Sequence, residues 1–361
     1  MKKFGLFAIL VLWLGLCVTA WVHPGEEISE SERRKLQQFP DISVKELLSG
    51  DWMEDFESYT LDQFPFRDAF RRVKALTHYN LLGQKDNNGI YIADGYAAKL
   101  EYPLNENSLR NALEKFRKIY DKYLTGSKVF FSVVPDKGYF LAESNGYPAM
   151  DYKALMNTMA EGMPWAEFVD ISDQLNLESY YKTDTHWRQE QLLGVAQKLC
   201  EALGTDAFEQ GELALEVLER PFYGVYYGQA ALPMDAEQMY VVRQGILDNH
   251  TVYNHENGKT TGIYDWSKLE SQDLYDVFLS GAAALLTIEN PTGNSDKELI
   301  IFRDSYGSSL IPLLLKDYAK VTVIDTRYIA PDLLSRFVDF HGQDVLMLYS
   351  TLLLNNSFSL K

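Results

Sequence analysis

The sequence predicts an α/β protein whose mainly parallel sheet is flanked by helices. Continuous apolar runs occupy residues 128–134, 298–302, 321–324 and 344–348. Runs of this length are typical of parallel strands, because such strands are buried on both faces of their sheet. Amphipathic helical patterns separate several of these runs, and an alternation of strands and helices places helices over both faces.

The chain begins with an uncharged run, Phe4 to Val22, that follows Lys2 and Lys3. Its length approaches that of a membrane-spanning helix and exceeds that of an ordinary signal-peptide core. We therefore expect residues 4–22 to be a single-pass membrane anchor, with the lysines cytoplasmic and the remaining chain extracytoplasmic. The alternative is a secreted protein that is cleaved near Ala20.

Three regions are expected along the chain. Residues 1–22 are the anchor or signal peptide, residues 23–85 a juxtamembrane and helical segment, and residues 86–361 the α/β domain. In the second region an apolar stripe runs through 44–80, and Phe64-Pro-Phe-Arg67 interrupts it before a basic amphipathic helix.

The periodicity changes near residue 88, where the α/β domain begins. An Asp94-Gly95 turn between two alternating stretches predicts a β-hairpin over residues 89–100. Residues 205–295 are rich in Tyr, Gly, Asn and Asp, and we expect them to be an insertion of strands and loops. The remaining expected elements are helices at 107–123, 151–162, 186–203 and 308–320, and a short strand at 168–171.

Charge and cysteine content exclude several classes of function. With 51 acidic and 34 basic residues the formal net charge is −17, so the surface repels phosphate backbones and no nucleic-acid partner is expected. The two cysteines, Cys17 and Cys200, cannot build a disulfide framework or a cysteine-based metal site. No metal-ligand spacing is present in the sequence, and we expect no cofactor.

A candidate nucleophile, Ser305, lies where a buried strand gives way to a helix. Its segment is Arg303-Asp-Ser-Tyr-Gly-Ser-Ser309. This position is the carboxyl edge of the sheet, where α/β sites form, and the first N–H groups of the helix can hold an oxyanion. Asp and Ser also precede helices as simple caps, and the segment taken alone favours that interpretation.

A second constellation contains Asp184 and His186 within Asp-Thr-His-Trp187. Side chains two apart on an extended segment share a face, so the carboxylate can bond Nδ1–H of the imidazole. Nε2 is then free to accept a proton from a serine hydroxyl. A helix cap at Asp184 or Thr185 is the competing interpretation of this pair.

Asp184-Thr-His-Trp187, followed by Asp304-Ser305-Tyr306, resembles the DHHW family, which is related to the SGNH-hydrolase-like proteins that O-acetylate alginate in the bacterial periplasm. The resemblance implies an SGNH-hydrolase-like fold for residues 86–361. It also implies a triad with Ser305 as nucleophile, His186 as general base and Asp184 as orienting acid. Further segments that agree are 64–67, 133–137, 222–228 and 325–328.

Other candidates surround this triad. Tyr306 and Arg327 are candidate substrate-binding residues, although Arg327 alternatively holds the loop after the sheet. The N–H groups of Ser305 and Gly281 are the candidate oxyanion donors. Arg303 stands where many SGNH enzymes have glycine, so we expect a different local turn.

The function implied is transfer of an acetyl group, through an acetyl-serine, onto a cell-surface or exported polysaccharide. A multi-pass membrane acyltransferase is the implied acetyl donor. The same triad would serve a carbohydrate acetylesterase, because the chemistry differs only in whether water or a sugar resolves the acyl-enzyme. A non-catalytic polysaccharide-binding or assembly factor is the third alternative.

Overall fold

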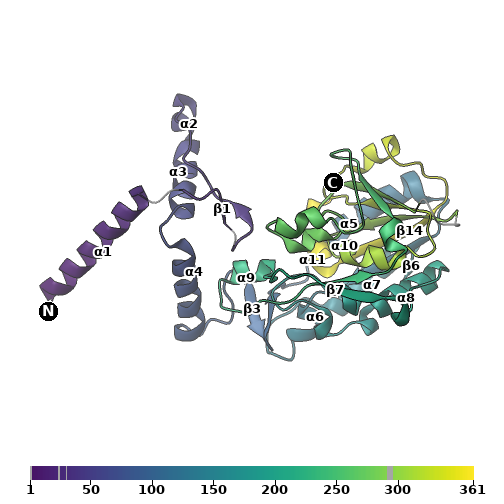
Figure 1. Cartoon of the computed structure of the whole chain (residues 1–361), viewed down its shortest axis with the longest axis horizontal. Coiled ribbons are helices and arrows are strands. Elements are labelled where there is room, and N and C mark those ends of the chain that lie inside the picture. The colour runs from purple at the N-terminus through teal and green to yellow at the C-terminus, as the bar shows by residue number, and fades with distance from the viewer. Residues whose placement is uncertain (1, 23–24, 30, 291–295) are drawn as a thin grey trace. The chain divides into compact units, whose positions relative to one another are not determined.

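The computed structural model describes residues 2–22, 25–29, 31–290 and 296–361 (Figure 1). The chain divides into two compact units. One comprises residues 1–88 and 227–234, and the other comprises residues 89–226 and 235–361. The second unit contains the main sheet and both motif segments.

The first unit is mainly helical. Gly50 separates two of its helices because it adopts a left-handed φ of 90°, and Phe66, with a φ of 57°, lies at the start of the next. The stripe predicted over residues 44–80 is therefore divided at these two positions. The elements are α1 (Lys2–Val22), β1 (Ile28–Ser29), β2 (Arg34–Lys35), α2 (Val44–Ser49), α3 (Asp51–Asp62), α4 (Arg67–Leu76) and a π-helical turn (Thr77–Leu81).

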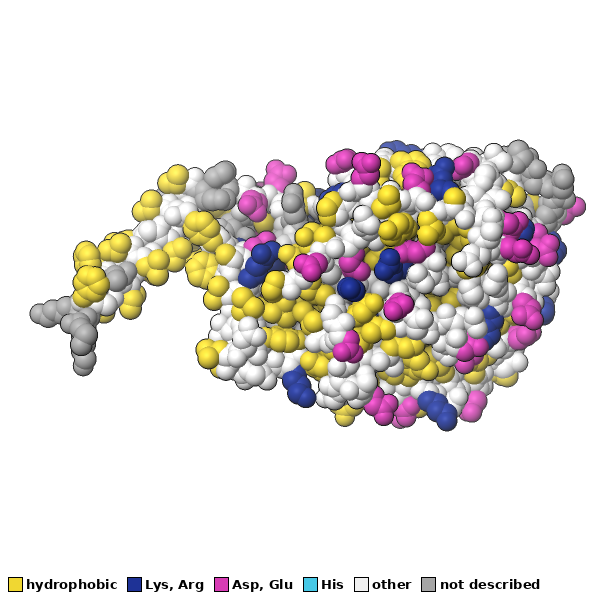
Figure 2. Space-filling model, turned by 60° about the horizontal axis from the view of Figure 1, so that its bottom comes forward, with side chains coloured by type: hydrophobic (Ala, Val, Ile, Leu, Met, Phe, Trp, Pro, Cys, Tyr) yellow, Lys and Arg dark blue, Asp and Glu magenta, His cyan; other side chains and the backbone are white. Residues whose placement is uncertain are grey.

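Helix α1 spans the predicted anchor, residues 4–22. Many of its apolar side chains are exposed (Figure 2), and these include Phe4, Leu6 and Trp13. Among the described residues, no helix has the combined length and apolar character needed to cross a membrane. The membrane role of residues 4–22 stays a prediction.

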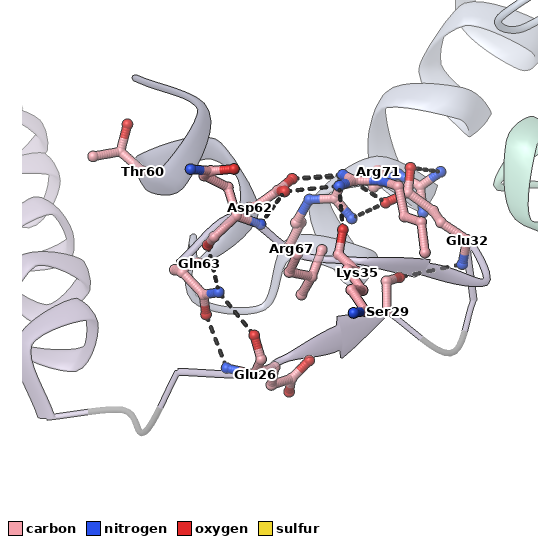
Figure 3. A network of polar contacts seen from close by, with 12 residues as sticks. Glu26, Ser29, Glu32, Lys35, Thr60, Asp62, Gln63, Arg67 and Arg71 are labelled. Atoms are coloured by element: carbon pink, nitrogen blue, oxygen red, sulfur yellow. Dashed lines mark hydrogen bonds and ion pairs between the residues drawn. The ribbon is translucent and has the colours of Figure 1, made fainter. Parts of the chain in front are cut away.

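An ion-pair network joins separate segments of the first unit (Figure 3). Arg34 donates two hydrogen bonds to Asp62, at 2.7 and 2.5 Å, and the Gln37 N–H donates a third at 2.9 Å. Arg67 and Arg71 both pair with Glu32, the latter at 3.1 Å. The network therefore connects the β1–β2 hairpin to α3 and α4.

The second unit contains an eight-stranded sheet of order β10-β9-β11-β13-β12-β14-β5-β6. Strands β13, β12, β14, β5 and β6 are parallel to one another, and β11, β9 and β10 extend the sheet by antiparallel pairing. The expectation of a mainly parallel sheet is confirmed. The strands are β5 (Val129–Val134), β6 (Glu167–Phe168), β9 (Thr251–Asn254), β10 (Lys259–Thr261), β11 (Leu285–Glu289), β12 (Glu298–Arg303), β13 (Lys320–Ile324) and β14 (Asp344–Ser350).

Alternate side chains of the parallel strands enter two separate cores. Ile301 of β12 packs in the core that contains α8, whereas Ile300 and Phe302 pack against α5, α7 and α11. Both faces of the parallel region are therefore covered, as the apolar runs predicted. The helices of this unit are α5 (Glu106–Ile119), α6 (Gly138–Leu141), α7 (Tyr152–Gly162), α8 (Leu193–Leu203), α9 (Val225–Ala230, which crosses into the first unit), α10 (Gly307–Leu310) and α11 (Thr351–Asn355).

Two small sheets complete the fold. The hairpin of β3 (Ile90–Ala93) and β4 (Tyr96–Lys99) has the expected Asp94-Gly95 turn, in which both residues have left-handed φ angles. Strands β7 (Ala214–Val217) and β8 (Tyr240–Arg243) pair outside the main sheet. The region 205–295 therefore supplies both this pair and β9 to β11, while residues 291–295 lie outside the described part of the chain.

Three expected elements differ from the structure. The helix predicted from residue 186 begins at Leu193, because residues 180–187 form an antiparallel loop that is closed by a Tyr180–Trp187 bridge. The helix predicted over 308–320 ends early, as a 3₁₀ turn over Ile311–Leu314, because Pro312 has no N–H to continue it. The strand expected at 168–171 is the two-residue β6.

Replacing Asp62 with Asn is expected to weaken the first unit by about 1 kcal/mol, because a neutral amide cannot pair with the Arg34 guanidinium and the site is partly solvated. Arg34 holds the pKa of Asp62 below 3.8, so the wild-type advantage is present above about pH 4 and lost as the pH falls. The hydrogen-exchange rates of the backbone amides of residues 34–37, compared between wild type and Asp62→Asn at neutral and acidic pH, measure this difference in stability. Asp55→Asn, on the exposed side of α3, is the control; equal exchange in both variants would contradict the prediction.

Candidate active site

The fold brings the two motif segments together at the carboxyl end of β12. Nε2 of His186 lies 2.8 Å from Oγ of Ser305, and Nδ1 lies 2.6 Å from Oδ1 of Asp184. Asp184 is fully buried and Ser305 is partly exposed. The three side chains form one hydrogen-bonded series in the order that the sequence predicted, so the serine hydroxyl is positioned to pass its proton to the imidazole.

Backbone N–H groups compensate the buried Asp184 carboxylate. Oδ1 also accepts the N–H of His186 at 3.0 Å, and Oδ2 accepts the N–H of Val225 at 2.8 Å. The segment that supplies Val225 approaches closely because residue 224 is glycine. A Cβ there would lie only 2.2 Å from Cα of Asp184, so a side chain at this position is incompatible with the observed loop.

The loop that carries Asp184 and His186 is fixed on several sides. The carboxylate of Glu237 accepts the N–H groups of Lys182 and Thr183, each at 2.8 Å. Nε1 of Trp187 donates to the carbonyl of Tyr306 at 2.9 Å, which ties the loop directly to the residue after Ser305. The geometry of the pair is therefore set by tertiary contacts and not by a helix cap.

The imidazole of His186 stacks on the ring of Tyr275, with centroids 3.9 Å apart and planes inclined by 7°. The hydroxyl of Tyr275 lies 2.8 Å from Oγ of Ser309 in the helix after Ser305. Burial raises the pKa of Tyr275, which keeps this phenol neutral. The stack fixes the ring orientation that directs Nε2 toward the serine.

The turn at Ser305 is held by its neighbour Asp304. One carboxylate oxygen accepts the N–H of Tyr306 at 3.0 Å, and the other accepts the N–H of Ser350 at 2.8 Å. The N–H of Ser305 itself has no acceptor among the residues that the structure describes. It is therefore available as an oxyanion donor.

Arg303, the departure from the SGNH pattern, is completely buried below this turn. Its Nη1 lies 3.7 Å from Asp325, which also accepts two hydrogen bonds from the guanidinium of Arg327, at 2.9 and 2.6 Å, and one from its backbone N–H at 3.1 Å. Burial lowers the pKa of Arg303, and its Nε atom has no hydrogen-bond partner in the described part of the molecule. Arg327 is thus engaged in holding Asp325, which fits the loop-holding alternative, and its role toward substrate stays a prediction.

The other two predicted site residues also have internal partners. The buried Tyr306 donates its hydroxyl to the carbonyl of Thr185 at 2.6 Å. The N–H of Gly281 donates to the carbonyl of Phe278 at 3.1 Å, within a turn in which Leu279 and Ser280 have left-handed φ angles. These contacts position the site, and they leave substrate binding by Tyr306 and oxyanion binding by Gly281 as predictions.

Sequence reasoning assigned no role to Lys137, which is fully buried beside the triad loop. Its Nζ donates to the carbonyls of Tyr181 and Lys182, at 2.8 and 3.2 Å, and lies 5.0 Å from the ring centroid of Tyr226. Lys137 ends the segment 133–137 that agrees with the family resemblance, but no sequence pattern shows that it is buried, because its carbonyl acceptors come from another part of the chain. No cluster of His, Cys, Asp or Glu side chains suited to a metal ion occurs among the described residues.

Replacing Gly224 with Ala should displace Asp184, because the added methyl group would overlap the backbone of that residue. We expect a loss of about 1–3 kcal/mol in unfolding free energy, and a loss of about 100-fold or more in any activity that depends on Ser305. Gly211→Ala is the matched control, since a Cβ there meets no atom within 4 Å. Equal activities of the two variants would show that the Asp184 position is not constrained in this way.

Lys137→Met tests the buried amine through the pH dependence of stability. Burial lowers the pKa of Lys137 to about 7, against the opposing charges of Asp184, Glu237 and Asp136. Between about pH 7 and 10 the amine is therefore protonated to a greater extent in the unfolded chain than in the folded protein. The unfolding free energy of the wild type should rise relative to Lys137→Met by roughly 1 kcal/mol per pH unit.

Denaturant unfolding at pH 7, 8 and 9 measures this difference. Lys153→Met, at an exposed lysine, is the control and should follow the wild type at every pH. A difference between wild type and Lys137→Met that is constant with pH would mean that the folded protein holds the amine protonated.

Comparisons with known proteins bear on the family and the fold. Residues 165–324 match the model of the DHHW protein family. A DHHW family protein from Eubacterium siraeum superimposes with a TM-score of 0.62 at 22% identity, over 76% of this chain and 95% of its own. The structure of Bacillus cereus PatB1 gives a TM-score of 0.58 at 15% identity, over 73% of this chain and 96% of its own. The structure of PatB1 with a sulfonyl adduct gives a TM-score of 0.57 at 13% identity, over 73% of this chain and 95% of its own.

No curated protein sequence matches the chain. The structural similarities establish the fold, and the family match spans the Asp184-Thr-His-Trp and Asp304-Ser-Tyr segments that first suggested the resemblance. The chain thus carries a DHHW-family segment over residues 165–324, on a fold shared with a solved DHHW protein.

Proposed function

We propose that this protein is an extracytoplasmic O-acetyltransferase that modifies a cell-surface or exported polysaccharide through Ser305. The observation that carries the proposal is the unbroken series from Ser305 Oγ through both nitrogens of His186 to the buried Asp184. Such a series is the arrangement that activates a serine for acyl transfer.

In the first half-reaction, Ser305 Oγ attacks the carbonyl carbon of the acetyl donor while its proton moves to Nε2 of His186. Asp184 accepts the Nδ1–H and stabilises the imidazolium that forms. The N–H of Ser305 donates to the oxyanion of the tetrahedral intermediate. Collapse of this intermediate breaks the bond to the leaving group, which takes the proton from His186 and leaves acetyl-Ser305.

In the second half-reaction a sugar hydroxyl attacks the acetyl-serine. His186 removes the proton of that hydroxyl, and returns it to Ser305 Oγ when the ester bond to the serine breaks. The sugar leaves with the acetyl group, and the enzyme regains its starting protonation state. Attack by water in place of the sugar gives acetate, which is the esterase outcome.

Acetyl is the proposed group because the two motifs resemble those of proteins that O-acetylate alginate. A multi-pass membrane acyltransferase is the proposed donor, and residues 4–22 are proposed to tether the enzyme in the membrane beside it. The acidic balance, a net charge of −17, is consistent with an acceptor that is not a nucleic acid.

The full-length protein in detergent should release p-nitrophenol from p-nitrophenyl acetate, and should acetylate an added oligosaccharide acceptor. Ser305→Ala is expected to reduce both rates by about 1,000-fold or more, because the nucleophile is lost. Ser267→Ala, at an exposed serine in a different segment of the chain from Ser305, is the control. Release that depends on Ser305 without any transfer would identify an esterase.

A sulfonyl fluoride provides a readout that needs no acetyl donor. An activated Ser305 should displace fluoride and form a sulfonyl ester, which mass spectrometry of the peptide locates; PatB1, a neighbour in fold, has been solved with a sulfonyl adduct. Ser305→Ala is expected to react with neither p-nitrophenyl acetate nor the sulfonyl fluoride. If the wild type is equally inert to both reagents, the protein is better explained as a non-catalytic polysaccharide-binding or assembly factor.

A further inference from the structure

A polar groove lies on the sheet surface away from the candidate triad. It has a volume of about 430 Å³, and strands β9, β10, β11 and β13 form its floor. The loop that follows the 3₁₀ turn Pro331–Arg336 contributes Phe337, Val338 and Asp339 to its lining. The groove belongs entirely to the second unit of the chain.

The strand register places a row of hydroxyl groups along the floor. Thr260 pairs with Tyr253, Tyr253 with Thr287, and Thr287 with Thr322, so the row crosses four adjacent strands. Cross-strand partners lie on the same face of a sheet, and three inter-strand spacings give the row a length of roughly 14 Å. This length accommodates a short oligosaccharide.

The floor hydroxyls are available to a ligand. Within the described part of the chain, only Thr287 has a hydrogen-bonding partner, Nε2 of His255 at 2.9 Å. Thr322 is 7% exposed and lines the groove, and its hydroxyl is not among the buried polar atoms that lack a partner, so it is open to a ligand or to water.

Aromatic rings flank the row. Tyr253 is 42% exposed and Phe337 is 53% exposed, and His255 lies between them in edge contact with both, at centroid distances of 4.8 and 6.1 Å. Exposed rings beside hydroxyl groups offer an apolar face together with hydrogen-bonding groups. The apolar face of a sugar ring and its hydroxyls match this combination.

Charge favours a neutral ligand. The rim carries Glu289 and Asp339, while its only lysine, Lys320, lies 3.7 Å from Glu298. Burial lowers the pKa of His255, so the ring adds no positive charge near neutral pH. An anionic chain would meet two carboxylates and one lysine here, on a protein whose net charge is already −17.

We propose that this groove binds a segment of a neutral polysaccharide and so holds the acceptor chain while a distant part of it reaches Ser305. Thr322 pairs with Ile300, which precedes Ser305 by five residues, or roughly 16 Å along the strand. The groove is thus a site separate from the triad. A floor of threonines also disfavours a protein partner, because the cores of protein interfaces are apolar.

The identity of the ligand rests on the proposed function, but its binding is measurable without catalysis. Isothermal titration of the full-length protein in detergent, with cellotetraose, chitotetraose and tetramannuronate as probes, tests the proposal. At least one neutral probe should bind, and tetramannuronate should bind more weakly. Tyr253→Ala and Phe337→Ala, from two different elements, should each weaken binding about tenfold.

Two variants serve as controls. Phe358→Ala removes a ring that is 65% exposed outside the groove and should bind like the wild type. Ser305→Ala should also bind like the wild type, so a failure of the proposed chemistry and a failure of the groove give different results. Melting temperatures verify that all variants are folded.

Three results would overturn the proposal. The first is that no neutral probe binds at about 10 mM, a concentration that would detect even weak sites. The second is that the groove variants Tyr253→Ala and Phe337→Ala bind as well as Phe358→Ala does. The third is that Ser305→Ala loses binding, which would place the sugar at the triad alone. Concentration-dependent dimers that Tyr253→Ala disrupts would instead make this face an interface between copies of the chain.

Discussion

The arrangement of the candidate site depends on one buried carboxylate. Asp184 has no contact with solvent, so its charge is tolerable only where hydrogen bonds replace water. His186 supplies two of these bonds through its ring and its backbone, and Val225 supplies another. The hydrogen bonds to this one carboxylate therefore fix the orientation of the imidazole. They also require glycine at position 224, because the segment that carries the Val225 N–H passes too close to Asp184 for a side chain.

A second level of constraint lies beneath the serine. Arg303 is buried where a smaller residue would leave space, and it faces Asp325, which Arg327 also holds. A buried ion pair of this kind adds little stability, since desolvation offsets the attraction. Its physical effect is to join the ends of β12 and β13, so that the turn carrying Ser305 starts from a fixed position.

The sheet serves two different purposes along its width. Its parallel part is covered by helices on both faces and presents Ser305 at its carboxyl end. Its antiparallel extension has one face that carries hydroxyls and exposed rings in place of a helix. The region 205–295, which is rich in tyrosine, contributes Tyr253 to this face.

Much of this molecule was determined locally and could be predicted from the sequence. The apolar runs are strands and the Asp94-Gly95 hairpin forms, because each depends on neighbours within a few residues. The members of the triad were implied by the family resemblance of the two motifs, each of which taken alone also fits a helix cap. Tertiary structure alone decided the rest. The helix after His186 starts late because the Tyr180–Trp187 bridge closes a loop before it. Lys137 and Gly224 adjoin the Asp184 loop because their partners come from segments about 40 residues away, whose approach no local pattern encodes.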